Sequence, residues 1–420
     1  MKTLLAALTL CTALNGQTLN TLYIFGPNNI GYFPGGVAIG PNGEFYGVTL
    51  RGAGYKNGAA FKLTPPAVSG GMWAPAVLHE FTTTEGPSTG GLWVNGITLG
   101  PDGVIYGTAQ PNRTAGPGEV FALEPPPPQG GRWREQILHV FGAGTTDGQY
   151  PNGPPVFGQE KVLYGTTRQG GAYNAGVVYR LVPSSSPGGA WTEDILYNFG
   201  AYSGDGEAPQ GALAIGSDGS LYGATEEGGT GYGTIFQLSP PDASGGSWTE
   251  TVLHAFGTDT GDQFPTGVVM GPHGSLYGGT AQYGRVCPPE CGVIFELAPP
   301  ATAGGPWTET TLHTFTYGTG DGIEPGAVPV FGPDGALYGT TGSGGTAGGY
   351  GTIFKLVPPA ALGATWTEVI LYSFTGTADS AGPSPIAFGP DGNLYGITVE
   401  TTTLFGKILD YGTAFQLVLQ

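Results

Sequence analysis

The sequence predicts an all-β fold, a seven-bladed β-propeller with four strands per blade, and three observations support this prediction. A segment of the Leu-Tyr-Gly type recurs seven times along the 420 residues, with its tyrosines 55 to 61 residues apart, a spacing typical of repeat proteins. The third strand of the repeat, with its Phe or Tyr, also occurs seven times, but the fourth strand, which opens on Trp, occurs only six times. The N-terminal segment 18–26, TLNTLYIFG, resembles the missing fourth strand. We therefore expect it to complete the last blade and close the ring, which leaves no sheet edge exposed.

Each repeat is expected to supply four strands in the same order. The first is short and apolar, as in 212–215, and the turn that follows is usually Asn-Gly or Asp-Gly, residues that tolerate positive φ. The second strand carries Leu-Tyr-Gly, the third resembles 233–238 (GTIFQL) and the fourth resembles 248–256 (WTETVLHAF). All are rich in β-branched and aromatic residues and are bounded by Gly and Pro. The predicted blades cover residues 34–81, 94–141, 154–199, 210–256, 266–315, 326–374 and 384–417, the last together with 18–26.

The composition supports a folded, turn-rich chain and excludes some partners. Gly and Pro are abundant (80 and 37 residues), but charged residues are only 10% and aromatic residues reach 11%, which is the opposite of a disordered chain. The formal net charge of −18 argues against nucleic acid and anionic lipid as partners, since both are negatively charged.

Residues 1–16 predict export. They carry one Lys followed by an apolar run from Leu4 to Leu14, which is too short to span a bilayer and is typical of a Sec signal peptide cleaved near Gly16. No later stretch is apolar enough for a membrane helix. We expect residues 17–420 to form a single propeller, monomeric and soluble, either secreted or periplasmic.

Connection lengths differ between the two rims of the predicted propeller. The first–second connections have one length in all seven repeats, and the third–fourth connections have one length in all six complete cases. The second–third and fourth–first connections vary in length and share the opposite rim. Because function usually lies on varied loops held by a rigid scaffold, the varied rim is the predicted binding face.

The chain resembles a known family, the exported tandem-repeat proteins called GloVer or choice-of-anchor proteins. The resemblance rests on LYGTT at 163–167, Gly170-Gly171, WTE at 191–193, the segment DGIEP at 321–325 and GTIF at 351–354. It covers nearly the whole mature chain and implies an exported, propeller-like repeat protein without implying a particular activity. Members commonly end in a surface-anchoring signal, whereas Gln420 directly follows the last predicted strand, so surface attachment is left open.

Four of the five histidines occupy one position of the repeat, six residues after the fourth-strand Trp: His79, His139, His254 and His313. Two other repeats have Tyr197 and Tyr372 there. These side chains share a strand face with Trp and Phe, so we interpret them as an aromatic column between blades rather than as catalytic bases or metal ligands. His273 lies in a predicted turn and should be solvated.

Aspartates recur in the fourth–first connections: Asp147, Asp205, Asp262, Asp321 and Asp379. Calcium is one interpretation, but Ca²⁺ takes six to eight oxygen ligands and no Asp-x-Asp-x-Asp cluster supplies them. Hydrogen bonds from the side chain to the backbone of its own loop explain the recurrence better. The sequence therefore predicts no cofactor, with calcium as the alternative.

Cys287 and Cys291 are the only cysteines of the mature chain and lie in a long second–third connection. In an exported protein two such thiols are expected to form a disulfide. Two ligands alone would make a poor metal site.

The varied rim contains the candidate ligand-binding residues, which are those that break the repeat. Aromatic rings with scattered charged groups suit sugar rings or a protein partner, although the tyrosines could instead simply cover the end of the propeller. The candidates are Arg168, Tyr173, Glu226, Glu227, Tyr232, Arg285, Tyr350 and Asp410.

The leading hypothesis is a binding or scaffold protein that recognises a glycan or a protein on this rim. One alternative is a carbohydrate-active hydrolase or lyase that uses acidic and Arg residues of the rim, and another is a structural cell-surface component. No His-Glu-x-x-His or phosphate-loop motif occurs, and no catalytic residue is predicted.

Overall fold

The computed structural model describes most of the chain after residue 16. The described residues are 17–26, 29–52, 58–68, 70–81, 92–111, 116–186, 189–242, 245–257, 263–281, 290–302, 304–318, 320–346, 349–360, 365–377, 379–400, 403–404, 407–408 and 411–420. The predicted signal peptide, residues 1–16, lies outside them.

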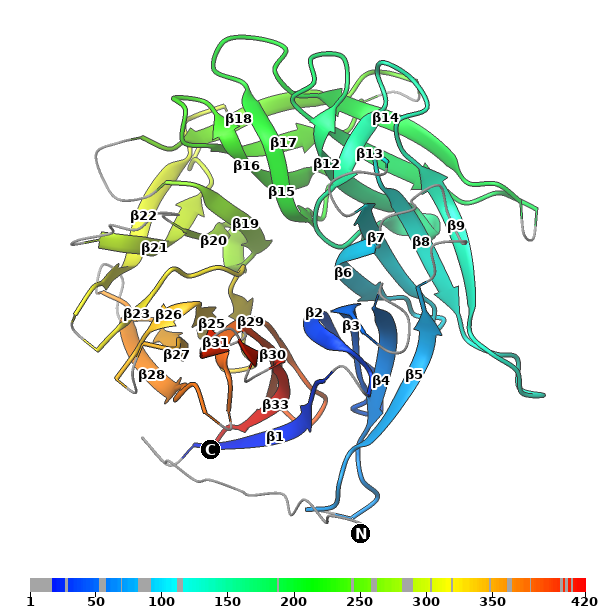
Figure 1. The fold of residues 1–420 in the computed structure, drawn as a ribbon. Coiled ribbons are helices and arrows are strands. Elements are labelled where there is room, and N and C mark those ends of the chain that lie inside the picture. Colours follow the sequence, from blue (N-terminus) through cyan, green and yellow to red (C-terminus); the bar gives the residue numbers. More distant parts are fainter. Residues whose placement is uncertain are drawn as a thin grey trace.

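Seven antiparallel sheets surround a central axis, so the predicted seven-bladed β-propeller is confirmed (Figure 1). The strands of blades 1 to 4 are β2 (Tyr32–Ile39), β3 (Phe45–Arg51), β4 (Ala59–Thr64) and β5 (Ala74–Glu80); β6 (Leu92–Leu99), β7 (Ile105–Pro111), β8 (Glu119–Glu124) and β9 (Arg134–Val140); β10 (Gly148–Pro151), β11 (Val156–Phe157), β12 (Leu163–Gly170), β13 (Val177–Val182) and β14 (Thr192–Asn198); β15 (Gly206–Ile215), β16 (Leu221–Gly228), β17 (Thr234–Ser239) and β18 (Thr249–Ala255). Those of blades 5 to 7 are β19 (Pro265–Met270), β20 (Leu276–Thr280), β21 (Glu290–Ala298) and β22 (Thr308–Thr316); β24 (Val330–Phe331), β25 (Leu337–Thr341), β27 (Thr352–Val357) and β28 (Thr367–Ser373); β29 (Ala381–Phe388), β30 (Leu394–Glu400), β33 (Thr413–Val418) and β1 (Thr18–Ile24).

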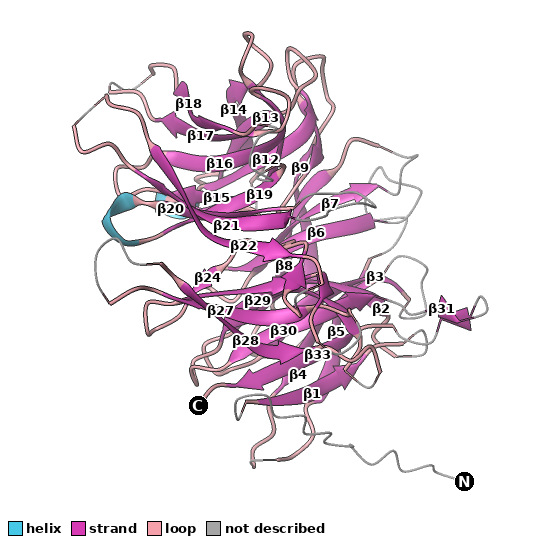
Figure 2. Cartoon of the chain, turned by 90° about the vertical axis from the view of Figure 1, so that its left-hand side faces the viewer, coloured by secondary structure: helices cyan, strands magenta, loops and turns pink. Residues whose placement is uncertain are grey.

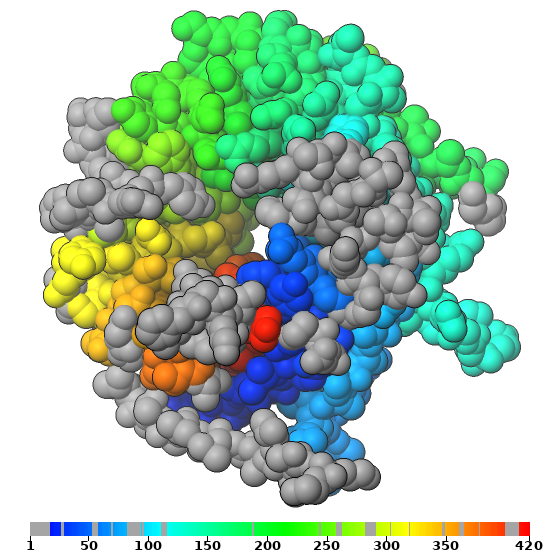
Figure 3. Space-filling model, viewed as in Figure 1, coloured from blue at the N-terminus to red at the C-terminus, as the bar shows by residue number. Residues whose placement is uncertain are grey.

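The N-terminal strand closes the ring, as predicted. Strand β1 pairs antiparallel with β33, with Thr18 opposite Val418 and Thr21 opposite Phe415. Just beyond the strand, the amide of Phe25 donates to the carbonyl of Gly412 over 3.0 Å. In Figure 3, blue surface from the N-terminal part of the described chain borders red surface from its C-terminal part.

The first strands of two blades differ from the prediction of one short strand. In blade 3 this strand is split into β10 and β11, which pair with opposite ends of β12. In blade 6, β24 forms only two residue pairs, and β23 (Gly322–Ile323) pairs separately with β26 (Ser343–Gly344). Prolines interrupt both strands, at 154 and 155 and at 329, because proline has no amide to donate to a sheet.

The core lies between the blades. Seven clusters of buried apolar side chains occur, one at each blade junction, and each blade is thus packed on both faces. The Gly of Leu-Tyr-Gly permits this packing in each blade: a Cβ on Gly223 would lie 2.6 Å from Cζ of the buried Phe236. The Gly of the second strand thus leaves the space that the aromatic ring of the third strand occupies.

The two rims lie on opposite sides of the molecule. Figure 2 shows a 3-10 turn of the first–second connections on the left, and the hairpin of β31 (Thr403–Leu404) and β32 (Lys407–Ile408), in the last second–third connection, on the right. The two 3-10 turns, Gln159–Lys161 and Pro272–Gly274, occur where the sequence lacks the usual Asp-Gly or Asn-Gly turn. Within the described part of the chain, no helix is long and apolar enough to cross a membrane.

The Asp-Gly turns form as predicted, but the Asp does not adopt the positive φ that was expected to explain its presence. The positive φ falls on the Gly, for example 78° at Gly103. The carboxylate of Asp102 instead accepts a hydrogen bond from the amide of Val104, at 3.3 Å. His273 is exposed with a φ of 59°, as expected of a turn residue.

Candidate functional site

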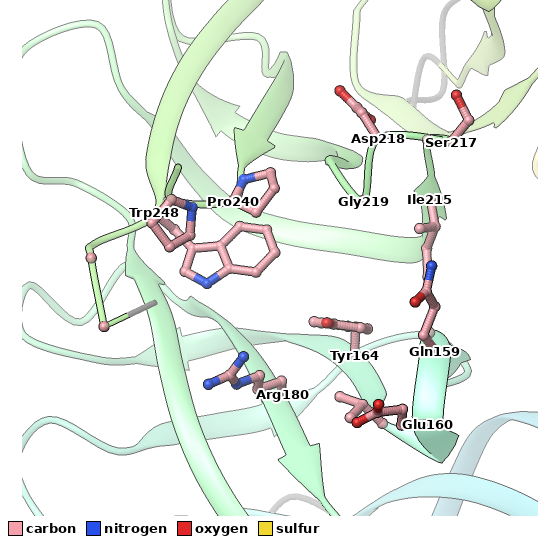
Figure 4. A pocket seen from close by; sticks show the side chains of 16 residues that line it. Gln159, Glu160, Tyr164, Arg180, Ile215, Ser217, Asp218, Gly219, Pro240 and Trp248 are labelled. Carbon is pink, nitrogen blue, oxygen red and sulfur yellow. The ribbon is translucent and has the colours of Figure 1, made fainter. Parts of the chain in front are cut away.

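A groove of about 610 Å³ lies between blades 3 and 4. Its walls come from the first–second turns 158–162 and 216–219 and from the third–fourth connection that leads to Trp248. It is therefore on the uniform rim, opposite the rim that the sequence predicts for binding. Figure 4 shows Trp248 and Tyr164 bordering the same hollow, with Arg180 beside them and Gln159 and Glu160 on another wall.

Aromatic contacts between blades form the floor of this groove. The ring centroids of Tyr164 in β12 and Trp248, the residue before β18, are 6.3 Å apart. The same Tyr–Trp contact recurs at other junctions, as in Tyr222–Trp307 at 6.2 Å. The rim therefore presents a repeated aromatic arrangement that becomes a hollow between blades 3 and 4.

The residue that packs above the repeat tyrosine varies between blades. Where the first strand of the next blade ends in Phe, that ring packs on the tyrosine of the preceding blade, as Phe157 does on Tyr106 at 4.9 Å and Phe331 does on Tyr277 at 5.0 Å. Ile215 holds the corresponding position above Tyr164 and fills less space. Tyr164 is half-buried, whereas five of the seven repeat tyrosines are no more than 7% exposed. The Ile alone does not explain this difference, since Tyr395 is 4% exposed although Ile39 holds the same position beside it.

The cross-strand neighbour of Tyr164 also differs from those of other blades. In blades 4 to 7 the tyrosine hydroxyl is bonded to a side chain of the same blade; the pairs are Tyr222–Gln237, Tyr277–Glu296, Tyr338–Asp334 and Tyr395–Asp391. In blade 3 the residue opposite Tyr164 is Arg180, whose Nε donates to Asp194 Oδ2 at 2.8 Å. Among the described residues the Tyr164 hydroxyl has no hydrogen-bond partner, as is also the case for Tyr46 and Tyr106 of blades 1 and 2. It is therefore available to a ligand in the groove.

Polar groups surround the aromatic floor. Gln159, Glu160 and Ser217 are exposed on the two turns, and Asp218 accepts hydrogen bonds from the amide and the hydroxyl of Ser220. A hollow with an aromatic floor and both donors and acceptors on its walls suits a polar ligand with one apolar face.

On the varied rim, the structure brings together two of the predicted ligand-binding residues. Arg168 at the end of β12 and Glu226 near the end of β16 form an ion pair, with 2.7 Å between Nη2 and Oε2. Glu227, the next residue, is exposed. This pair joins blades 3 and 4, and both partners keep part of their surface exposed.

The predicted tyrosines of the varied rim have different environments. Tyr173 is 57% exposed, whereas Tyr232 packs on Phe264, with ring centroids 6.1 Å apart. Tyr350 lies against Gly376 and the blade 6–7 core. Tyr232 and Tyr350 therefore cover the end of the propeller, and Tyr173 presents a free ring.

The other candidates are only partly described. Arg285, Asp410 and Cys287 lie outside the described residues. Cys291 is fully buried in β21, and its pairing with Cys287 stays a prediction. A smaller hollow of about 200 Å³, lined in part by Glu324, Ser343 and Ser384, lies between blades 6 and 7. Ligand binding on the varied rim stays a prediction.

The ring contacts expected of an aromatic column between blades are present. His139 and Phe141 have ring centroids 4.7 Å apart, and Phe141 in turn contacts Tyr179 of the next blade at 5.1 Å. The same pattern occurs with His79, His254 and His313.

Carboxylates beside these histidines were not anticipated from the sequence. His79 lies 3.2 Å from Glu135 of the next blade, and His139 and His313 each lie near one Asp and one Glu. Burial raises the pKa of Glu193 and of Glu368 to about 7, although the neighbouring histidine acts to lower it. The Glu belongs to the Trp-Thr-Glu segment of the following blade, so only the assembled ring brings the groups together.

The loop aspartates bond to their own backbone, as predicted. Asp147 Oδ2 accepts from the amide of Ala143 at 2.8 Å, and Asp205 Oδ2 accepts from that of Ala201 at 2.9 Å. Asp379 does the same with Thr375. Asp262, one of the calcium candidates, lies outside the described residues.

The sequence of this chain matches a repeat family. Residues 94–303 and 242–420 match the Gloeobacter/Verrucomicrobia repeat. The chain belongs to this family. The resemblance to GloVer proteins inferred from the repeat motifs is thus confirmed, and no curated protein matches the chain.

Several solved structures are similar in fold. One is a putative oxidoreductase (glucose dehydrogenase) from Thermus thermophilus, 16% identical, with a TM-score of 0.46 over 96% of this chain and 100% of that chain. Another is an α-L-arabinanase from Penicillium chrysogenum, 15% identical, with a TM-score of 0.45 over 78% and 92%. A luciferin-regenerating enzyme is 11% identical, with a TM-score of 0.44 over 96% and 95%. At these identities and scores, the likeness says nothing about the activity of this chain.

Proposed function

We propose that this protein is an exported propeller that binds an uncharged oligosaccharide in the groove between blades 3 and 4. The observation that carries the proposal is the pair of half-buried rings, Tyr164 and Trp248, on the floor of a groove of about 610 Å³. That volume is within the range of small-molecule sites. The leader expected at 1–16 supports an extracytoplasmic location, where such ligands are abundant.

The chemistry of the groove favours a sugar over other ligands. A pyranose ring has an apolar face that can pack on an indole or a phenol, and its edge carries hydroxyls for Gln159, Ser217 and the free Tyr164 hydroxyl. Arg180 is already paired with Asp194, and the net charge is −18. An anionic ligand would therefore find no free cation here and would be repelled by the whole molecule.

A glycan array probed with the full chain tests the proposal, followed by titration of the best-bound oligosaccharide. Trp248→Ala should weaken binding about 30-fold, since a central aromatic anchor is worth about 2 kcal/mol or more. Tyr164→Phe, which removes only the hydroxyl, should weaken it severalfold.

Trp307→Ala is the matched control, because Trp307 has the same repeat position and contacts Tyr222, whose hydroxyl is already bonded. It should bind the oligosaccharide like the wild type and match Trp248→Ala in stability. Equal loss of binding in both Trp variants, or binding abolished by Arg168→Ala and untouched by Trp248→Ala, would place the site elsewhere. An array without any bound glycan would overturn the proposal.

A further inference from the structure

Between blades 2 and 3, one imidazole and two carboxylates converge. His139 Nε2 is 3.4 Å from Glu193 Oε2 and 3.7 Å from Asp147 Oδ1. The three residues come from three segments: β9, the fourth–first connection, and β14 of the next blade. Their potential ligand atoms all lie within 4.8 Å of one another.

The same arrangement recurs between blades 5 and 6. His313 Nε2 is 3.2 Å from Asp321 Oδ2 and 3.6 Å from Glu368 Oε1. These ligand atoms also lie within 4.8 Å of one another. Two clusters with the same residue types in the same repeat positions show that the geometry follows from the repeat itself.

The carboxylates of both clusters have buried oxygens without a hydrogen-bond partner among the described residues. The side chains of Asp147 and Asp321 are only 9% and 10% exposed. Within the described part of the chain, the Oδ1 atoms of both, together with Glu193 Oε1 and Glu368 Oε1, are buried without a hydrogen-bond partner. Carboxylates that converge in a partly buried place repel one another unless a positive charge or a proton lies between them.

At two other junctions a Tyr stands in place of the His and bonds the Asp without a cation. The hydroxyl of Tyr197 donates to Asp205 at 2.9 Å, and that of Tyr372 donates to Asp379 at 3.0 Å. Glu250, the glutamate at the first of these junctions, accepts from the Tyr202 hydroxyl at 2.8 Å. At the second junction the glutamate position is Leu19. The first Tyr junction thus offers its two carboxylates two hydroxyl donors, although Glu250 Oε1 is buried without a hydrogen-bond partner in the described part of the chain. Each His cluster offers its two carboxylates a single imidazole nitrogen.

We propose that each of the two His–Asp–Glu clusters binds one Zn²⁺ ion that links adjacent blades. One imidazole nitrogen and two carboxylate oxygens are common Zn²⁺ ligands, and tetrahedral bonds of about 2.0–2.2 Å separate ligand atoms by roughly 3.3–3.6 Å. The nitrogen–oxygen distances of 3.2–3.7 Å are close to that separation. A water molecule would complete each site. The role is structural, since the three ligands belong to two blades and the connection between them.

The test uses the full chain, stripped with a chelator and then titrated with Zn²⁺, with bound metal counted by elemental analysis and affinity measured by calorimetry. His139→Tyr and His313→Tyr should each lose one equivalent of Zn²⁺, and the double variant should lose two. Tyr is chosen because Tyr197 and Tyr372 occupy the same position in this chain. In the wild type, Zn²⁺ should raise the apparent Tm by several degrees, and the double variant should lose most of this rise.

His273→Asn is the control, because His273 is exposed in a turn with positive φ that Asn tolerates. This variant should bind as many equivalents of Zn²⁺ as the wild type. Circular dichroism in chelator should show the double variant as folded as the wild type. A stripped wild-type chain that binds no Zn²⁺ at micromolar concentrations would overturn the proposal, as would a double variant that binds as much as the wild type.

Discussion

A mature chain lacking residues 17–25 is expected to lose its cooperative unfolding transition and to elute as aggregates. The deletion removes β1 and leaves the amides and carbonyls of β33 unpaired along a sheet edge, which is a template for association. It also removes Leu19 and Phe25 from the clusters on the two sides of blade 7. Loss of two such buried side chains costs on the order of 5–10 kcal/mol, which is comparable with the whole stability of a typical domain. Size-exclusion chromatography with light scattering and a thermal melt by circular dichroism measure both effects.

A permuted chain provides the control for this deletion. Residues 17–25 are placed after Gln420, with a linker that restores the ten-residue spacing found between Leu63 and Trp73 in blade 1. Because β1 pairs only with β33, the moved strand can take the same place, and the permuted chain should be monomeric and unfold cooperatively. A truncated chain that stays monomeric with an unchanged melting temperature would show that closure by β1 does not hold the ring together.

The ring could be predicted from sequence because its signals are local and repeated. Each Leu-Tyr-Gly segment needs its Gly, since the ring of the third-strand Phe or Tyr occupies the space of a Cβ, as Phe236 does at Gly223. The pattern is therefore expected in every blade. Counting the strands of each type then shows that one fourth strand is missing from the end of the chain. The interruptions in the first strands of blades 3 and 6 were not predicted. Their prolines remove individual hydrogen bonds between strands, and this does not change the spacing of the repeat.

The candidate sites are harder to predict from the sequence because they are formed by contacts between different repeats. The groove lies between Tyr164 of blade 3 and Trp248 of blade 4, and these residues meet only once the two blades are packed together. One signal was present: repeat 3 lacks the Asp-Gly turn. The His–Asp–Glu clusters likewise combine three segments, and Glu193 meets His139 only through the packing of blade 3 on blade 2.

Glu119 is expected to make the protein less stable as the pH rises from 5 to 9. This residue begins β8, is 2% exposed, and within the described residues its Oε1 has no hydrogen-bond partner. Burial, helped by the nearby charge of Glu135, raises its pKa to about 8. The folded chain then keeps the proton up to pH 8, whereas the unfolded chain releases it near the ordinary value of 4.5. Stability is therefore lost as the pH rises between these values, by on the order of 3–5 kcal/mol at about 1.4 kcal/mol per pH unit.

Glu119→Gln should remove this loss, because the amide resembles the protonated carboxyl and carries no charge at any pH. Urea unfolding at pH 5, 7 and 9, in chelator, should show similar stabilities at pH 5 and a variant more stable by several kcal/mol at pH 9. The raised pKa values of Glu193, Glu250 and Glu368, each about 7, act on both proteins alike, so the difference reports Glu119. Glu227→Gln, at an exposed position, should follow the wild-type curve. Parallel curves for Glu119→Gln and the wild type would mean that the folded chain accommodates the ionised Glu119, and the burial argument for this residue would then be wrong.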